Sequence, residues 1–474
     1  MIPLRRCPSA LVRYLAIALS ICVLVALFSG PSLGKLAPAG TASRPELEMA
    51  VPPAATDLEA GKQLYDAGRW LEALEFWQRA EAEAGGRGDR LTQARALRYR
   101  VMALQALSQW SAAESVLAQA WAIAQAFGPK LSSTADAQLL LAQLQITEGN
   151  LALAQGKADA ALVAFETGEQ WYEQMGDRTG LLLSRLNQAE ALQALGFYPR
   201  ARRRLTDLQA QLQAEPDSRL KGRSLRHLSS VLQAMGELDA AGQALDNSQQ
   251  IFAAVNDPNE LAETLFQQGQ LAQAQQQWAE AERLYGLSQT LSTQIEGQFK
   301  SASQRIRVVL RNPATQLEQT AQDQSQAIAQ AIALLSHLDR LPPSHWRFYT
   351  QINLAQSLLT APNSATATAT ALPLAQSLAR ATTQAHSLQD LRAESYLLAQ
   401  LGHLYEQQTQ YSDALRLSRQ ALSLARQINA DDMTASWLWQ TGRILAAQGQ
   451  TQAAIAPTAK PLACSRISAR SWWP

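Results

Sequence analysis

The fold is decided by the stretch Asp57–Ala80, which reads DLEAGKQLYDAGRWLEALEFWQRA. The spacing of its apolar residues predicts two short amphipathic helices, and Ala67-Gly68-Arg69 between them predicts a turn. The small residues Gly61 and Ala73 allow two helices to cross closely, and large side chains such as Trp77 fill the space around the crossing. The stretch is therefore predicted to be one helical hairpin.

The same pattern returns along the whole chain. With Ala73 as the reference position, an equivalent residue recurs at Ala113, Ala161, Ala201, Ala241, Ala281, Ala414 and Ala454. Five of the steps between these alanines are 40 residues, the step to Ala161 is 48, and Ala281 to Ala414 is three such steps plus 13 residues. A constant step indicates stacked repeats, and a generic alanine-rich bundle would not keep it.

The positions around each reference alanine repeat as well. A small residue lies twelve positions earlier, at Gly61, Gly149, Ala189, Gly269, Gly402 and Gly442. A large apolar residue lies four positions later, at Trp77, Leu117, Phe165, Leu205, Leu245 and Tyr285. The aromatic residues of the pattern are therefore interpreted as packing between helices and not as a ligand site.

This pattern resembles the tetratricopeptide repeat (TPR), in a version slightly longer than the usual unit of about 34 residues. The resemblance implies an all-α fold, namely a right-handed superhelical α-solenoid of TPR-like helix-turn-helix repeats of about 40 residues. In such an array the first helix of each repeat lines the concave side.

The N-terminal segment predicts export. Residues 1–34 combine a basic start with the uncharged run Leu15–Phe28 and small residues before Gly34, the layout of a cleaved signal peptide. The alternative is an uncleaved membrane anchor at residues 11–28, with its arginines on the cytoplasmic side. Both interpretations place the repeats in the periplasm or outside the cell, with the membrane contacted only through this segment. Residues 35–53 are expected to be a flexible linker.

The repeats divide the rest of the chain. We expect repeats one to six at 54–297, divergent helical repeats at 298–388, and further repeats at 391–456 with the last one incomplete. The aspartates at three repeat junctions are expected to cap the following helices: Asp177, Asp217 and Asp257. Pro457 and Pro461 fall where the last second helix should run, which predicts an irregular, aberrant tail at 457–474. We interpret this tail as a reading frame lost near Ala456, with a longer parent protein beyond it.

The composition excludes several classes of function. The net charge is +1, but the two ends hold six of the 41 bases and no acid, which leaves 35 bases against 40 acids in between. That balance argues against a nucleic-acid partner, which needs a basic stripe. The three cysteines lie outside the repeats, the five histidines lack zinc spacing, and no nucleophile or phosphate-binding motif is present. The chain is therefore predicted to have no catalytic residue, metal or cofactor.

The first helices supply the candidate binding residues. Positions 8, 11, 14, 15 and 18 residues before each reference alanine should face the groove of the solenoid. The candidate partner-binding residues are Arg95, Arg98, Tyr99, Asn150, Asn187, Glu190, Arg223, Arg226, Gln267, Gln270, His403 and Arg443. Amides there can bond the backbone of an extended peptide and arginine can clamp a carboxylate, so the expected partner is a protein or peptide. The alternative for each residue is an ordinary solvated helix face.

A second resemblance rests on the layout of the chain. The signal, the proline-containing linker, GKQLYDAGRWLEALEFWQRA at 61–80 and the GDR turns at 88–90 and 176–178 are similar to the N-terminal repeat array of bacterial, especially cyanobacterial, TPR–CHAT domain proteins. The resemblance covers residues 55–456. In that family a caspase-like CHAT domain with a His/Cys dyad follows the array. That domain is missing here, so the resemblance carries over no catalytic residue.

Two functions follow as hypotheses. The first is an exported, non-enzymatic TPR scaffold that binds a protein or peptide on its concave face. The alternative is a truncated TPR–CHAT protein whose peptidase domain is missing or encoded separately, and a downstream CHAT reading frame would favour it. A cytoplasmic transcriptional regulator is disfavoured, because it would need a DNA-binding segment and no export signal.

Overall fold

The computed structural model describes residues 53–128, 132–312, 320–361, 367–450 and 453–454. These ranges contain 19 helices and no strand. The predicted signal or anchor, nearly all of the predicted linker and the predicted tail lie outside them. Within these ranges, no helix combines the length and the apolar character needed to span a bilayer.

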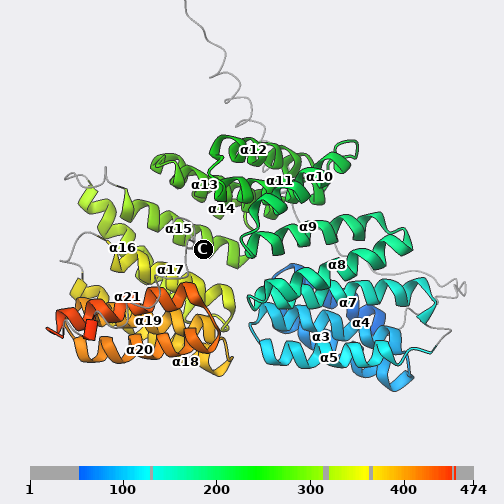
Figure 1. Cartoon of the computed structure of the whole chain (residues 1–474), viewed down its shortest axis with the longest axis horizontal. Helices are drawn as coiled ribbons and strands as arrows, with labels where there is room; N and C mark the ends of the chain where they lie inside the picture. The colour runs from blue at the N-terminus through cyan, green and yellow to red at the C-terminus, as the bar shows by residue number, and fades with distance from the viewer. Residues whose placement is uncertain (1–52, 129–131, 313–319, 362–366, 451–452, 455–474) are drawn as a thin grey trace, which may run out of the picture. The chain divides into compact units, whose positions relative to one another are not determined.

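The helices form successive hairpins, each made of a first and a second helix (Figure 1). The first helices are α2 (Pro53–Asp66), α4 (Arg90–Ala106), α7 (Ala135–Ala154), α9 (Arg178–Ala194), α11 (Arg219–Ala234), α13 (Pro258–Ala274), α15 (Ile295–Arg311), α17 (His345–Leu359), α19 (Leu391–Gln407) and α21 (Asp431–Ala447). The second helices are α3 (Trp70–Arg87), α5 (Trp110–Gln125), α8 (Ala158–Met175), α10 (Tyr198–Leu212), α12 (Leu238–Ala254), α14 (Trp278–Leu291), α16 (Thr320–Leu338), α18 (Ala367–Ser387) and α20 (Tyr411–Gln427). Extensive contacts join helices that are neighbours or next neighbours along the chain, as expected for a TPR-like solenoid.

The reference alanines occupy one structural position. Each donates its backbone N–H to the carbonyl four residues earlier, at the start of a second helix, over 2.9–3.0 Å. This bond is present at Ala73, Ala113, Ala161, Ala201, Ala241, Ala281, Ala414 and Ala454. The first seven of these alanines have no exposed surface. The predicted repeat register is confirmed.

The turn inside each of these hairpins requires a left-handed residue. Five residues before the reference alanine, φ lies between +57° and +82°, at Gly68, Ser108, Gly156, Gly196, Gly236, Gln276, Thr409 and Gly449. Glycine adopts this conformation without a steric penalty, whereas a side chain there costs about 1 kcal/mol. Three of the eight hairpins therefore carry a strained turn.

Exchanging the residues at two of these turns should have opposite effects on stability. We expect Gln276→Gly to raise the free energy of unfolding by up to about 1 kcal/mol and Gly196→Gln to lower it by a similar amount. No atom lies within 4 Å of a Cβ built on Gly196, so the backbone alone decides this effect. Urea unfolding of the two variants measures both changes, and changes of the same sign would contradict the prediction.

Where the two helices of a hairpin cross, the sizes of the two facing residues are matched. A Cβ built on Gly61, Gly149 or Gly269 would lie 2.3–2.8 Å from the ring of Trp77, Phe165 or Tyr285. Where the later position holds leucine, at Leu117, Leu205 and Leu245, the earlier one holds Val101, Ala189 and Ser229. Glycine is therefore required opposite an aromatic ring, and a larger residue fits opposite leucine.

Two of the three predicted aspartate caps are confirmed. The carboxylate of Asp177 accepts a hydrogen bond from the N–H of Gly180 at 3.0 Å, and that of Asp257 accepts one from Glu260 at 3.3 Å. The prediction for Asp217 was wrong. Ser218 caps α11 by accepting from the N–H of Lys221, while Asp217 pairs with the Lys221 ammonium at 3.2 Å. The hydroxyl lies one residue closer to the helix, at the N-cap position itself.

The stretch without a clear sequence register forms two more hairpins, α15 with α16 and α17 with α18. Gln389, after α18, has φ +56°. The equivalent junction residues Gly88, Gly176, Asn256 and Asn429, each fifteen after a reference alanine, are also left-handed. Leu374 lies fifteen residues before Gln389 and 40 residues before Ala414, and it is 1% exposed. Leu374 therefore takes the reference position in α18.

The hydrophobic core runs along the array as a series of clusters. The largest joins α15 to α21 and includes Phe348, Leu378 and Trp437. Another joins α4, α5 and α7, and a third joins α9, α10 and α11. Each hairpin thus covers the apolar side of the one before it.

Candidate partner-binding face

The twelve candidate residues all lie on first helices. They belong to α4, α7, α9, α11, α13, α19 and α21, and we call the surface that they mark the first-helix face. Asn150 and Glu190 are exposed, while Asn187, Gln267 and Gln270 are half-buried. Their role in binding stays a prediction, but the contacts of the charged residues show which of them are already engaged.

Arg223 and Arg226 are engaged by one carboxylate. Glu260, on α13, accepts hydrogen bonds from Arg223 Nε at 2.6 Å and from Arg226 Nη1 at 2.8 Å. Arg226 and Glu260 are each 8% exposed, and the Arg226 guanidinium also lies 5.5 Å from the centre of the Phe252 ring. Burial would raise the pKa of Glu260, but the two arginines outweigh it and lower that pKa. These arginines therefore tie α11 to α13.

The ring of His227 lies in the same charged region. Burial lowers its pKa, the Glu190 carboxylate opposes that shift, and Arg226 and Arg223 add to it. His227 is therefore neutral near pH 7 and can both donate and accept a hydrogen bond.

His403 and Arg443 meet at the other end of the array. Glu406 accepts two hydrogen bonds from Arg443, each 2.6 Å long, and these bonds raise the pKa of Arg443. Burial, followed by the charge of Arg443, lowers the pKa of His403. The Arg443–Glu406 pair joins α21 to α19, so Arg443 is also engaged within the array.

Arg98 is different, because it has no acid beside it among the residues that the structure describes. Its guanidinium lies 4.5 Å from the centre of the Tyr99 ring, and Tyr99 stacks in turn on Trp77 at 5.1 Å. Burial lowers the pKa of Arg98, and the nearby charged and phenolic groups are Tyr99, Tyr172 and Arg95. The buried Nε of Arg98 has no hydrogen-bond partner within the described ranges.

Sequence reasoning missed a second such arginine, Arg307 on α15. It is the thirteenth residue of its helix, as Gln270 is of α13, and it is 8% exposed. Burial, with a contribution from Arg311, lowers the pKa of Arg307 to about 10. Its Nε is buried without a partner in the described part of the chain. The run Ile306–Arg311, with two arginines four apart in an apolar stretch, is the signal that could have identified it.

Together these contacts divide five arginines of the first helices into two groups, and leave the half-buried candidate Arg95, on α4, outside both. Arg223, Arg226 and Arg443 are bound to carboxylates of neighbouring first helices. The half-buried Arg98 and the buried Arg307 carry a positive charge without such a carboxylate in the described part of the chain, a costly arrangement that an anionic ligand would relieve.

Comparisons with known proteins find similar solved structures but no matching family. No model of a protein family and no curated protein matches the sequence. Among solved structures, the chain is similar to a Rap protein complexed with competence and sporulation factor, with a TM-score of 0.47, 13% identity, and coverage of 79% of this chain and 98% of that one. It is also similar to the apo quorum sensor NprR from B. thuringiensis, with a TM-score of 0.44, 14% identity, and coverage of 78% of this chain and 99% of that one. A third similar structure is yeast Tom70, with a TM-score of 0.34, 12% identity, and coverage of 86% of this chain and 97% of that one. The resemblance to TPR–CHAT proteins stays a prediction.

Proposed function

We propose that this protein is a non-enzymatic scaffold that binds a peptide or a protein segment on its first-helix face. The observation that supports this most directly is two arginines without a carboxylate among the described residues: Arg98, which is half-buried, and Arg307, which is buried, each with a buried Nε that has no partner there. A protein that gained nothing from these charges would be more stable with apolar residues in their place. A ligand carboxylate can form parallel hydrogen bonds with a guanidinium, so the ligand should carry an acidic side chain or a free C-terminus.

The polar groups between the charges suit an extended ligand. Gln267 and Gln270 are half-buried on α13, and the side-chain Oε1 of Gln267 has no partner in the described ranges. An amide side chain can donate to and accept from a peptide backbone at once. Amides and guanidiniums that lack a carboxylate partner among the described residues, both on first helices, can thus provide backbone and carboxylate recognition.

The predicted signal or anchor supports the further proposal that the scaffold works outside the cytoplasm. A fusion of residues 1–34 to a reporter that is active only after export tests this part separately. A reporter that stays inactive would contradict export without affecting the peptide proposal.

Replacing Arg307 should separate binding from stability. We expect Arg307→Met to raise the free energy of unfolding by about 1 kcal/mol or more, because it removes a buried charge while keeping the volume. The same change should weaken, at least about tenfold, the binding of acidic peptides selected from a random library against the unmodified protein. Unfolding in urea and fluorescence anisotropy measure the two effects.

Arg305→Met is the matched control on the same helix. Arg305 is 40% exposed and lies 3.9 Å from Glu282, so its loss should change stability by less than about 0.5 kcal/mol and leave peptide affinity unchanged. If Arg307→Met destabilises the protein, or if the selected peptides carry no acid and bind the variant equally well, the proposal is wrong.

A further inference from the structure

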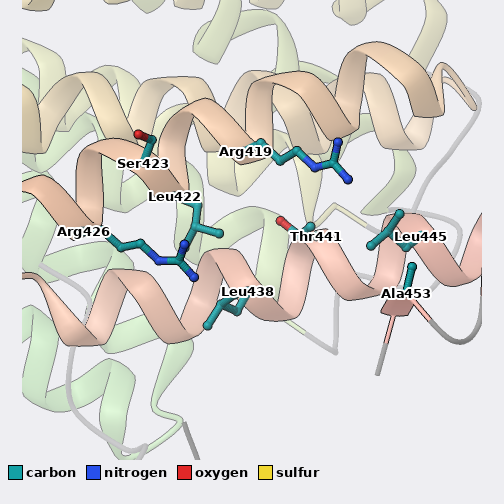
Figure 2. Close-up of a pocket in the computed structure, with 8 residues that line it drawn as sticks. All are labelled: Arg419, Leu422, Ser423, Arg426, Leu438, Thr441, Leu445 and Ala453. Carbon is teal, nitrogen blue, oxygen red and sulfur yellow. The ribbon is translucent and has the colours of Figure 1, made fainter. Parts of the chain in front are cut away.

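A pocket of about 620 Å³ opens between α20 and α21 (Figure 2). Both helices and the residues after α21 contribute to its lining, which consists of Arg419, Leu422, Ser423, Arg426, Leu438, Thr441, Leu445 and Ala453. Figure 2 shows Arg426 reaching from α20 toward α21, beside Leu422. The pocket thus combines an apolar base with two guanidiniums and no acid.

The pocket lies where the repeat places a second helix. Gly449 has φ +77°, and the N–H of Ala454 donates to the carbonyl of Gln450 at 3.0 Å, as at the start of the other second helices. The described residues end at Ala454. Leu438 and Thr441 of the pocket have equivalents 40 residues earlier, Leu398 and Leu401 of α19. These two residues belong to the same buried cluster as residues of α20. A helix seated in the pocket would cover α21 as α20 covers α19.

The charges around the pocket indicate which side chains a helix seated there should carry. Arg419 and Arg426 are exposed, and neither forms an ion pair within the described part of the chain. Arg416, on the same helix but outside the pocket, is already paired with Asp413 at 3.0 Å. Positions seven apart lie on one side of a helix, about 10.5 Å apart along its axis. A helix with acidic residues two turns apart beside its apolar stripe therefore complements this surface.

The sequence that follows Ala454 does not have this chemistry. It contains Pro457 and Pro461, which lack the N–H that a helix interior needs. Its charged residues are Lys460, Arg466 and Arg470, with no acid, so they match the sign of Arg419 and Arg426. These residues therefore do not complement the charges of Arg419 and Arg426.

We propose that this pocket binds an amphipathic helix of a partner protein, with leucine-like and small side chains along one stripe and acidic residues beside it. The partner helix takes the place of a second helix and completes the last hairpin in trans. This surface is distinct from the first-helix face, so the proposal does not rest on the proposed peptide binding.

The probe is a labelled peptide with the sequence of α20, which covers the equivalent surface of α19, carrying Arg416→Glu, Arg419→Glu and Arg426→Glu. The matched peptide keeps the three arginines. In low salt the full chain should bind the acidic peptide at least about tenfold more tightly, and higher salt should reduce this preference. In the protein, Arg419→Glu with Arg426→Glu should reverse the preference, whereas Arg416→Glu should change affinity less than about twofold.

Three results would overturn the proposal. The first is that the full chain binds neither peptide, as it would if its own C-terminal residues filled the pocket. The second is equal affinity for the two peptides, or affinity that the paired charge reversal leaves unchanged. The third is a dimer, detected by sedimentation, that this charge reversal dissociates, because the occupant would then be a second copy of the chain.

Discussion

Gly149→Ala is expected to lower the free energy of unfolding by about 1–3 kcal/mol, although alanine is the better helix former. The new Cβ would lie 2.4 Å from Cε1 and 2.6 Å from Cδ1 of Phe165. Phe165 has no exposed surface, so its ring cannot move aside without displacing the residues around it. Gly286→Ala, on α14, is the control, because a Cβ there would meet only Arg305 Cδ, at 3.9 Å. This change should raise the free energy of unfolding by up to about 1 kcal/mol.

Adding Phe165→Leu should rescue Gly149→Ala. The double variant recreates the pair Ala189 and Leu205 of the next hairpin, which share one buried cluster. We expect the double variant to be at least about 1 kcal/mol more stable than the sum of the two single changes predicts. Because repeat arrays need not unfold in one step, amide exchange within α7 and α8 should accompany urea unfolding. Simple additivity would contradict the proposed matching of sizes.

The features that sequence predicted are those fixed within one hairpin. The positions of Ala73 and its equivalents, the glycine opposite an aromatic ring and the turn residues all depend on contacts between two helices joined by one short turn. A fixed spacing along the chain therefore records them, and the structure confirms that spacing. The TPR-like solenoid follows from repeating this unit.

The features that sequence missed depend on how one hairpin meets the next. Arg223 and Arg443 each pair with an acid 37 residues away, a distance that no single repeat reveals. Arg307 was missed because the second helix before it is short: α14 has 14 residues where α12 has 17. The residues of α15 therefore come three positions earlier than a constant 40-residue step predicts. Local patterns predicted which residues pack within a hairpin, whereas the pairing of charges between first helices also depends on the lengths of the junctions.

Glu260→Gln should destabilise the protein by about 3–5 kcal/mol, because it leaves the buried Arg226 without its counter-charge. The variant keeps the volume of the side chain, so lost packing cannot explain the effect. Glu263→Gln, on the same helix, is the control. Glu263 pairs with Lys300 at 3.0 Å, but both side chains are more than a third exposed, so the change should stay within about 0.5 kcal/mol.

The pH dependence of stability tests whether charge causes the effect of Glu260→Gln. Because its arginine partners lower the pKa of Glu260 in the folded protein, the carboxylate stabilises the fold fully above its ordinary pKa of about 4.3. This stabilisation is lost as the pH falls through the lower, folded value. The difference in unfolding free energy between the unmodified protein and Glu260→Gln should therefore be largest near pH 7 and shrink below pH ~4.3. A difference that stays constant from neutral to acidic pH would contradict a charge effect. It would assign the effect to hydrogen bonding alone, because glutamine differs from the carboxylate in having only one acceptor oxygen as well as in lacking the charge.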